Sequence, residues 1–160
     1  MKKVILVLLT LVPVLAGYLI NTTLLVPVVG MLLFYILPLA VLIFWFWLGI
    51  QYSKTNWGVI PSILIGSATG IVSLALYLWQ FVVQDSETRN LAIAGLSQMY
   101  STATPIYLTA RLAALFETQP NYIGRTTATA LQVISLILMI AVFTAGFFWG
   151  KNARRRKSYM

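Results

Sequence analysis

Few residues in this chain could carry chemistry, because its 160 positions include no histidine and no cysteine. Histidine is the commonest general base and metal ligand, and cysteine thiolates serve as nucleophiles and zinc ligands. The chain also lacks the G-x-x-x-x-G-K, G-x-S-x-G and H-E-x-x-H motifs. A serine nucleophile with a lysine base would need a lysine inside an apolar run, and none lies there. We therefore predict no catalytic residue, no metal site, no cofactor and no enzymatic activity.

One candidate polar site lies in the segment 84–127, where Arg111 and Glu117 could face a ligand. Asp85 and Glu87 could pair there with Arg89 or Arg125. The competing interpretation is that these charges belong to the solvated faces of amphipathic helices, which needs no ligand.

Small residues form the second candidate site. Gly66 and Gly70 stand four positions apart near Ser73, and Gly146 and Gly150 repeat this spacing. Small residues at this spacing let helix backbones approach closely within a membrane, and nearby hydroxyls can bond across the contact. We predict that these five residues form helix-packing or partner interfaces. Ordinary packing within one bundle is the simpler form of this prediction, since such motifs recur by composition alone.

The elements that must position these residues are four apolar runs, at 4–20, 24–50, 59–83 and 128–150. The chain is 60% hydrophobic and 9% charged, with a mean hydropathy of +0.89, so lipid must be the solvent of most side chains. A helix needs about 20 residues to cross the hydrocarbon core, and each run approaches or exceeds that length. Pro38, in the middle of the second run, is predicted to kink its helix.

The charged residues predict how the runs cross the bilayer. Positive residues beside membrane spans stay on the cytoplasmic side. Eight of the eleven basic residues flank the runs on one side: Lys2, Lys3, Lys54, Lys151, Arg154, Arg155, Arg156 and Lys157. The last four would also anchor the tail, 151–160, to anionic headgroups, which explains the net charge of +8 without nucleic acid. Both termini are therefore expected in the cytoplasm. The simplest host is a bacterium that carries this chain in its inner membrane.

The first run has a second interpretation, because two lysines, an apolar stretch and Val14-Leu15-Ala16 resemble a signal peptide with a cleavage site. We favour an uncleaved anchor. Either way, the second run starts outside and the chain ends inside.

The segment 84–127 is long for a linker and is expected to fold. Asp85 or Ser86 could cap a helix through Gln98 or Tyr100, and Thr104-Pro105 could open another through Phe116. Arg111 argues against a fifth span, since an arginine at the bilayer centre costs about 2.5–3.5 kcal/mol on insertion scales. We predict an outer helical hairpin that lies on the membrane or caps the bundle, with Asn21-Thr22-Thr23 as the other outer turn.

The predicted fold is a single all-α integral membrane domain over 1–160, a four-transmembrane-helix bundle with an extracytoplasmic helical hairpin between helices 3 and 4. We predict a non-catalytic accessory or regulatory subunit of a larger membrane complex for transport, secretion or envelope maintenance. Its partners would be membrane lipids and other integral membrane proteins or copies of itself. One alternative is a passive small-molecule or lipid transport protein, a homo-oligomer with a polar path along Ser62, Ser67, Thr69 and Ser73. Another is an immunity-type membrane protein that binds a toxin through 84–127.

Overall fold

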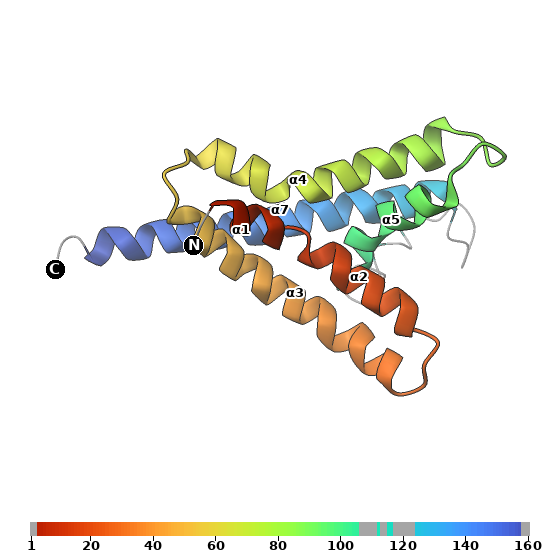
Figure 1. Cartoon of the computed structure of the whole chain (residues 1–160), viewed down its shortest axis with the longest axis horizontal. Helices are drawn as coiled ribbons and strands as arrows, with labels where there is room; N and C mark the ends of the chain where they lie inside the picture. Colours follow the sequence, from red (N-terminus) through yellow and green to blue (C-terminus); the bar gives the residue numbers. More distant parts are fainter. Residues whose placement is uncertain (1–2, 106–111, 113–114, 117–123, 158–160) are drawn as a thin grey trace.

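The computed structural model describes residues 3–105, 112, 115–116 and 124–157, and over these it is helical with no strand (Figure 1). Four helical stretches are long and apolar enough to cross a membrane. They are α1 and α2 (Lys3–Leu9, Val12–Thr23), α3 (Val29–Ser53), α4 with the π-helix η1 (Val59–Leu78, Trp79–Val83) and α7 (Arg125–Lys157). The prediction of an all-α chain with four such helices is confirmed for the described residues.

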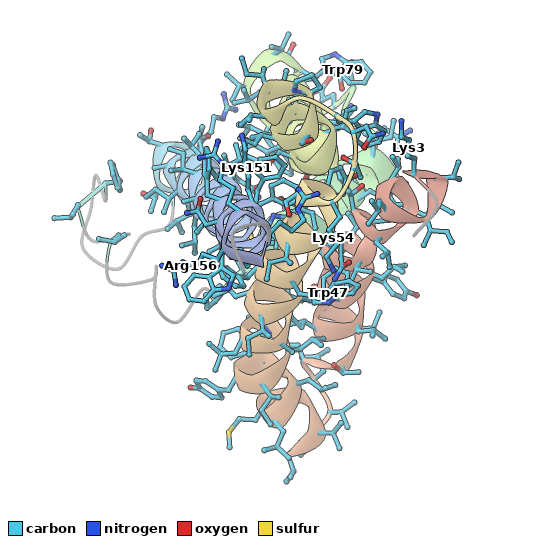
Figure 2. The ribbon with its side chains drawn as sticks, turned by 90° about the vertical axis from the view of Figure 1, so that its left-hand side faces the viewer. Lys3, Trp47, Lys54, Trp79, Lys151 and Arg156 are labelled. Carbon is cyan, nitrogen blue, oxygen red and sulfur yellow. The ribbon has the colours of Figure 1, made fainter. Side chains whose placement is uncertain are left out.

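The helices form a bundle that is tight at one end and spread at the other (Figure 1). We call the first the basic end, because Lys3, Lys54 and Lys151 lie there together (Figure 2), and the other the far end. Helices α4 and α7 run side by side, and α3 crosses α7 near the basic end. Towards the far end α3 diverges from them together with α2. The start of α1 and the end of α7 both lie towards the basic end.

The first apolar run is divided, although the sequence predicts one helix over 4–20. Helix α1 ends at Leu9 and α2 starts at Val12. Pro13, in the first turn of α2, is the physical reason, because proline has no N–H and its ring clashes with the carbonyl four residues earlier. The Thr10 hydroxyl donates to the Val7 carbonyl at 2.7 Å and so closes the last turn of α1.

The predicted outer turn at Asn21-Thr22-Thr23 is wrong. Helix α2 continues through these residues to Thr23, and the turn lies at 24–28. The hydroxyls of Thr22 and Thr23 donate to the carbonyls of Tyr18 and Leu19 at 2.9 and 2.6 Å, so both stay satisfied inside the helix. The second span accordingly starts at Val29 and not at Leu24.

Helix α5 (Leu91–Thr102) follows the third span and starts later than predicted. Asp85 and Ser86 do not cap it. Asn90 does, because its side-chain oxygen accepts from the backbone N–H groups of Ala92 and Ile93 at 3.0 and 3.2 Å. Most of the predicted second helix of the hairpin lies outside the described residues. Helix α5 packs chiefly on α2 and α4, so it enters the bundle from the far end and does not lie over it (Figure 1).

The fourth span is longer than predicted, since α7 runs from Arg125 to Lys157 and not only over 128–150. Thr126 and Thr127 do not cap it, because they lie inside its first turn. The Thr127 hydroxyl donates instead to the Phe116 carbonyl at 3.0 Å.

Candidate helix-packing site

Glycines bring the backbones of α3 and α7 into direct contact. A Cβ atom on Gly49 of α3 would collide with the carbonyl of Phe143, and one on Gly146 of α7 would collide with the carbonyl of Phe46. Gly150 meets α3 one turn further along. Because a backbone carbonyl cannot move aside as a flexible side chain can, this crossing requires residues without a side chain. The second predicted motif therefore packs against a helix of its own chain.

One face of α4 consists of small buried residues that include the first predicted motif. The space over its two glycines is filled by rings: Phe143 lies over Gly66, and Tyr100 lies over Gly70. This face therefore contacts α5 and α7 of the same chain. Its buried members are Ser62, Gly66, Ser67, Gly70 and Ser73.

The rings over α4 belong to an aromatic cluster that joins three helices. Phe143 of α7 lies with its ring centroid 5.9 Å from Trp45 and 5.2 Å from Tyr52, both on α3. Tyr100 at the end of α5 lies 6.2 Å from Trp45 in an edge-to-face arrangement. All four side chains are buried. Such pairs add about 0.5–1.5 kcal/mol beyond the area that they bury, so this cluster is the centre of the core.

Three hydrogen bonds of serine and threonine hydroxyls join segments of the bundle that are distant in sequence. Ser73 on α4 donates to the Ser97 carbonyl on α5 at 2.6 Å, so the small face of α4 anchors the inserted helix. The other two bonds join hydroxyl oxygens 2.9 Å apart: Thr10 with Thr69, and Thr104 with Ser135. Bonds of this kind between membrane helices are worth about 0.6–2 kcal/mol each.

Some buried polar atoms of the core have no hydrogen-bond partner among the described residues. Three belong to the aromatic cluster and two to the small face of α4: Trp45 Nε1, Tyr52 Oη, Tyr100 Oη, Ser62 Oγ and Ser67 Oγ. An unpaired polar group costs free energy wherever water is excluded. Hydroxyl and indole groups offer hydrogen bonds, but they supply neither a metal ligand set nor a strong general base. Among the described residues, no three His, Cys, Asp or Glu side chains stand close enough to hold a metal ion.

The structure describes only part of the predicted outer polar site. Arg111 and Glu117 lie outside the described residues. Arg89 turns back onto the end of the third span, where its Nε donates to the Gln80 carbonyl at 2.9 Å. Its guanidinium carbon lies 4.5 Å from the centroid of the Phe81 ring. The Arg89 cation is thus held by a carbonyl and a ring at η1.

The remaining predicted residues lie apart from this core. Pro38 is buried inside α3, which continues through it as one helix, so the kink stays a prediction. At the end of α7, Arg154, Arg155 and Arg156 are exposed, and Lys157 is the last residue of that helix.

Sequence reasoning missed two glycines of this site. Gly49 is the partner of Gly146 across the α3–α7 crossing. Gly17 of α2 lies against Met99 of α5, where a Cβ would collide with the Met99 carbonyl. Neither belongs to a pair spaced four apart. The available signal was a lone glycine inside a run of large apolar residues, which in a membrane helix indicates close backbone approach.

Comparison with known proteins adds no relative: no family model, no curated protein and no solved structure matches the chain.

Proposed function

We propose that this chain is a non-catalytic subunit of a larger membrane assembly, with four membrane-crossing helices and both termini in the cytoplasm of a bacterial cell. The sequence supports this through the absence of Asp, Glu, Lys, Arg and His from 4–53, 55–84 and 126–150. Proton relays and ion-coupled carriers usually place such a group inside a span.

The observation that carries the proposal is an exposed stripe on α3. Four residues at spacings of four, three and four are between 46% and 72% exposed: Leu32, Ile36, Leu39 and Ile43. Alternating steps of three and four place side chains along one seam, which is how one helix packs along another in a coiled coil. The stripe lies where α3 diverges from α4 and α7 (Figure 1). We propose that a helix of a partner protein, in place of lipid, covers this stripe.

The packing within the chain also supports the α3 stripe as the partner surface. Both predicted small-residue motifs are occupied within the chain, so a partner must use another surface. A polar path along α4 is not favoured, because rings of Phe143 and Tyr100 fill the space over Gly66 and Gly70.

Gentle extraction of the tagged full chain, followed by quantitative mass spectrometry of co-purifying membrane proteins, tests the proposal. Ile36→Trp, on the stripe, is expected to reduce recovery of the partner by about five- to a hundredfold, since one misfitted side chain at a helix seam costs about 1–3 kcal/mol. The matched control is Ile60→Trp on α4, where the side chain is 71% exposed. Recovery of the chain as a lone monomer, or equal losses in both variants, would contradict the proposal.

A further inference from the structure

A polar cleft lies at the basic end, between the start of α1 and the turn that joins α3 to α4. Its volume is about 220 Å³. The lining residues come from two segments that are distant in sequence, and two are lysines: Lys3, Leu6, Gln51, Lys54, Thr55 and Asn56. Figure 2 looks at the molecule from this end and labels Lys3 and Lys54.

The two lysines of the cleft are held by neutral groups. Lys54 Nζ donates to Gln51 Oε1 at 3.0 Å, and Lys3 Nζ lies 5.2 Å from the centroid of the Trp57 ring. All three acidic residues of the chain lie between positions 85 and 117, and none precedes them. The segments that line the cleft therefore supply two positive charges and no carboxylate, so the cleft has the charge to attract an anion.

An apolar groove adjoins this cleft and shares Lys3 with it. The groove has a volume of about 300 Å³ and runs along α1, where Val4, Val7 and Leu8 line it together with Trp57. A ligand that occupies both spaces must carry a negative group next to an apolar chain. Tryptophan at the border between them is typical of the membrane–water interface.

We propose that the cleft and groove together bind one anionic phospholipid, with its phosphate between Lys3 and Lys54 and the start of an acyl chain along Val4, Val7 and Leu8. Lysine binds phosphate as a point charge and has three N–H donors to offer it. The cleft is smaller than the roughly 300–1,000 Å³ of pockets that enclose whole drug-sized ligands, and this suits a headgroup whose remainder lies in lipid. The site uses no residue of the α3 stripe, so it is independent of the proposed partner.

The test is native mass spectrometry of the full chain in an uncharged detergent, titrated with phosphatidylglycerol or phosphatidylcholine. We expect tighter retention of phosphatidylglycerol by the unmodified chain. Lys3→Gln with Lys54→Gln should weaken that retention at least about tenfold. The matched control, Lys151→Gln with Arg125→Gln, removes the same charge outside the cleft and outside the Arg154–Lys157 anchor, and should change it less than about threefold.

A second variant tests the groove. Val7→Trp fills it without changing charge and should weaken retention of phosphatidylglycerol while circular dichroism shows an unchanged helix content. Inorganic phosphate and glycerol phosphate at millimolar concentration should not displace the lipid. Equal effects of the two double variants, equal retention of the two lipids, an unchanged Val7→Trp, or displacement by free phosphate would overturn the proposal.

Discussion

At the residue scale, Val28 has the most unusual backbone of the described chain. Its φ of 65° and ψ of −58° are those of a rare γ-turn, and the Val29 N–H donates to the Pro27 carbonyl at 2.7 Å across it. A β-branched residue with positive φ is strained, typically by about 1–3 kcal/mol.

We therefore predict that Val28→Gly stabilises the protein, although glycine usually destabilises by about 0.5–1 kcal/mol through its unfolded-state freedom. The midpoint of thermal unfolding, followed by circular dichroism in detergent, should rise. The neighbouring control, Val29→Gly in the first turn of α3, should lower it. A fall in both variants would show that Val28 stores no strain.

The same turn shows what single residues could not predict. Asn21-Thr22-Thr23 has the composition of a turn, yet it forms the end of α2, because threonine hydroxyls can bond carbonyls of their own helix. Conversely, the sequence predicts one helix over 4–20, yet α1 and α2 separate just before Pro13. Turn-forming residues favour turns in water, because water can replace the backbone hydrogen bonds that a helix loses. In an apolar environment no water is present to replace them, so the helix continues.

At the element scale, the contact between α3 and α7 depends on glycine. We predict that Gly146→Leu destabilises the bundle by about 3 kcal/mol or more, because the new side chain would displace the Phe46 backbone at an overpacked contact. The matched control is Ala145→Leu, at the preceding exposed position. Denaturant unfolding in mixed micelles should separate the two variants, and equal stabilities would mean that α3 and α7 do not cross at this glycine.

The spacing of Ile93, Leu96 and Tyr100 places them on one apolar face of α5, and only part of that face is buried. Leu96 is 57% exposed, whereas Ala94, Ser97 and Tyr100 are buried. Apolar periodicity finds the face that avoids water, but inside a membrane both faces can avoid it. The face with the smaller side chains is then the one that packs against other helices. The residue that α5 approaches closely, Gly17 of α2, is distant in sequence, so the contact could not be predicted.

At the scale of the whole molecule, hydropathy predicted the four long apolar helices, and the orientation that charge predicts in a membrane stays a prediction. The apolar runs predicted the number of long helices, but three of the four helices start or end at other residues than predicted. The grouping of Lys3, Lys54 and Lys151 at one end agrees with the sequence argument that these residues share a side (Figure 2). How far α5 enters the bundle could not be predicted, because it depends on hydrogen bonds between distant segments, such as the one from Ser73 to the Ser97 carbonyl.

That grouping leads to a prediction about orientation. The chain contains no cysteine, so single cysteines can be introduced at exposed positions of each end. In intact cells, a membrane-impermeant maleimide should label Ser86→Cys at the far end and leave Asn152→Cys at the basic end unlabelled until the membrane is permeabilised. The reason is that lysines and arginines beside membrane spans are retained on the cytoplasmic side. Labelling of Asn152→Cys in intact cells, with Ser86→Cys protected, would reverse the orientation. The α3 stripe would then diverge from the bundle on the cytoplasmic side, and the lipid cleft would face the outer leaflet.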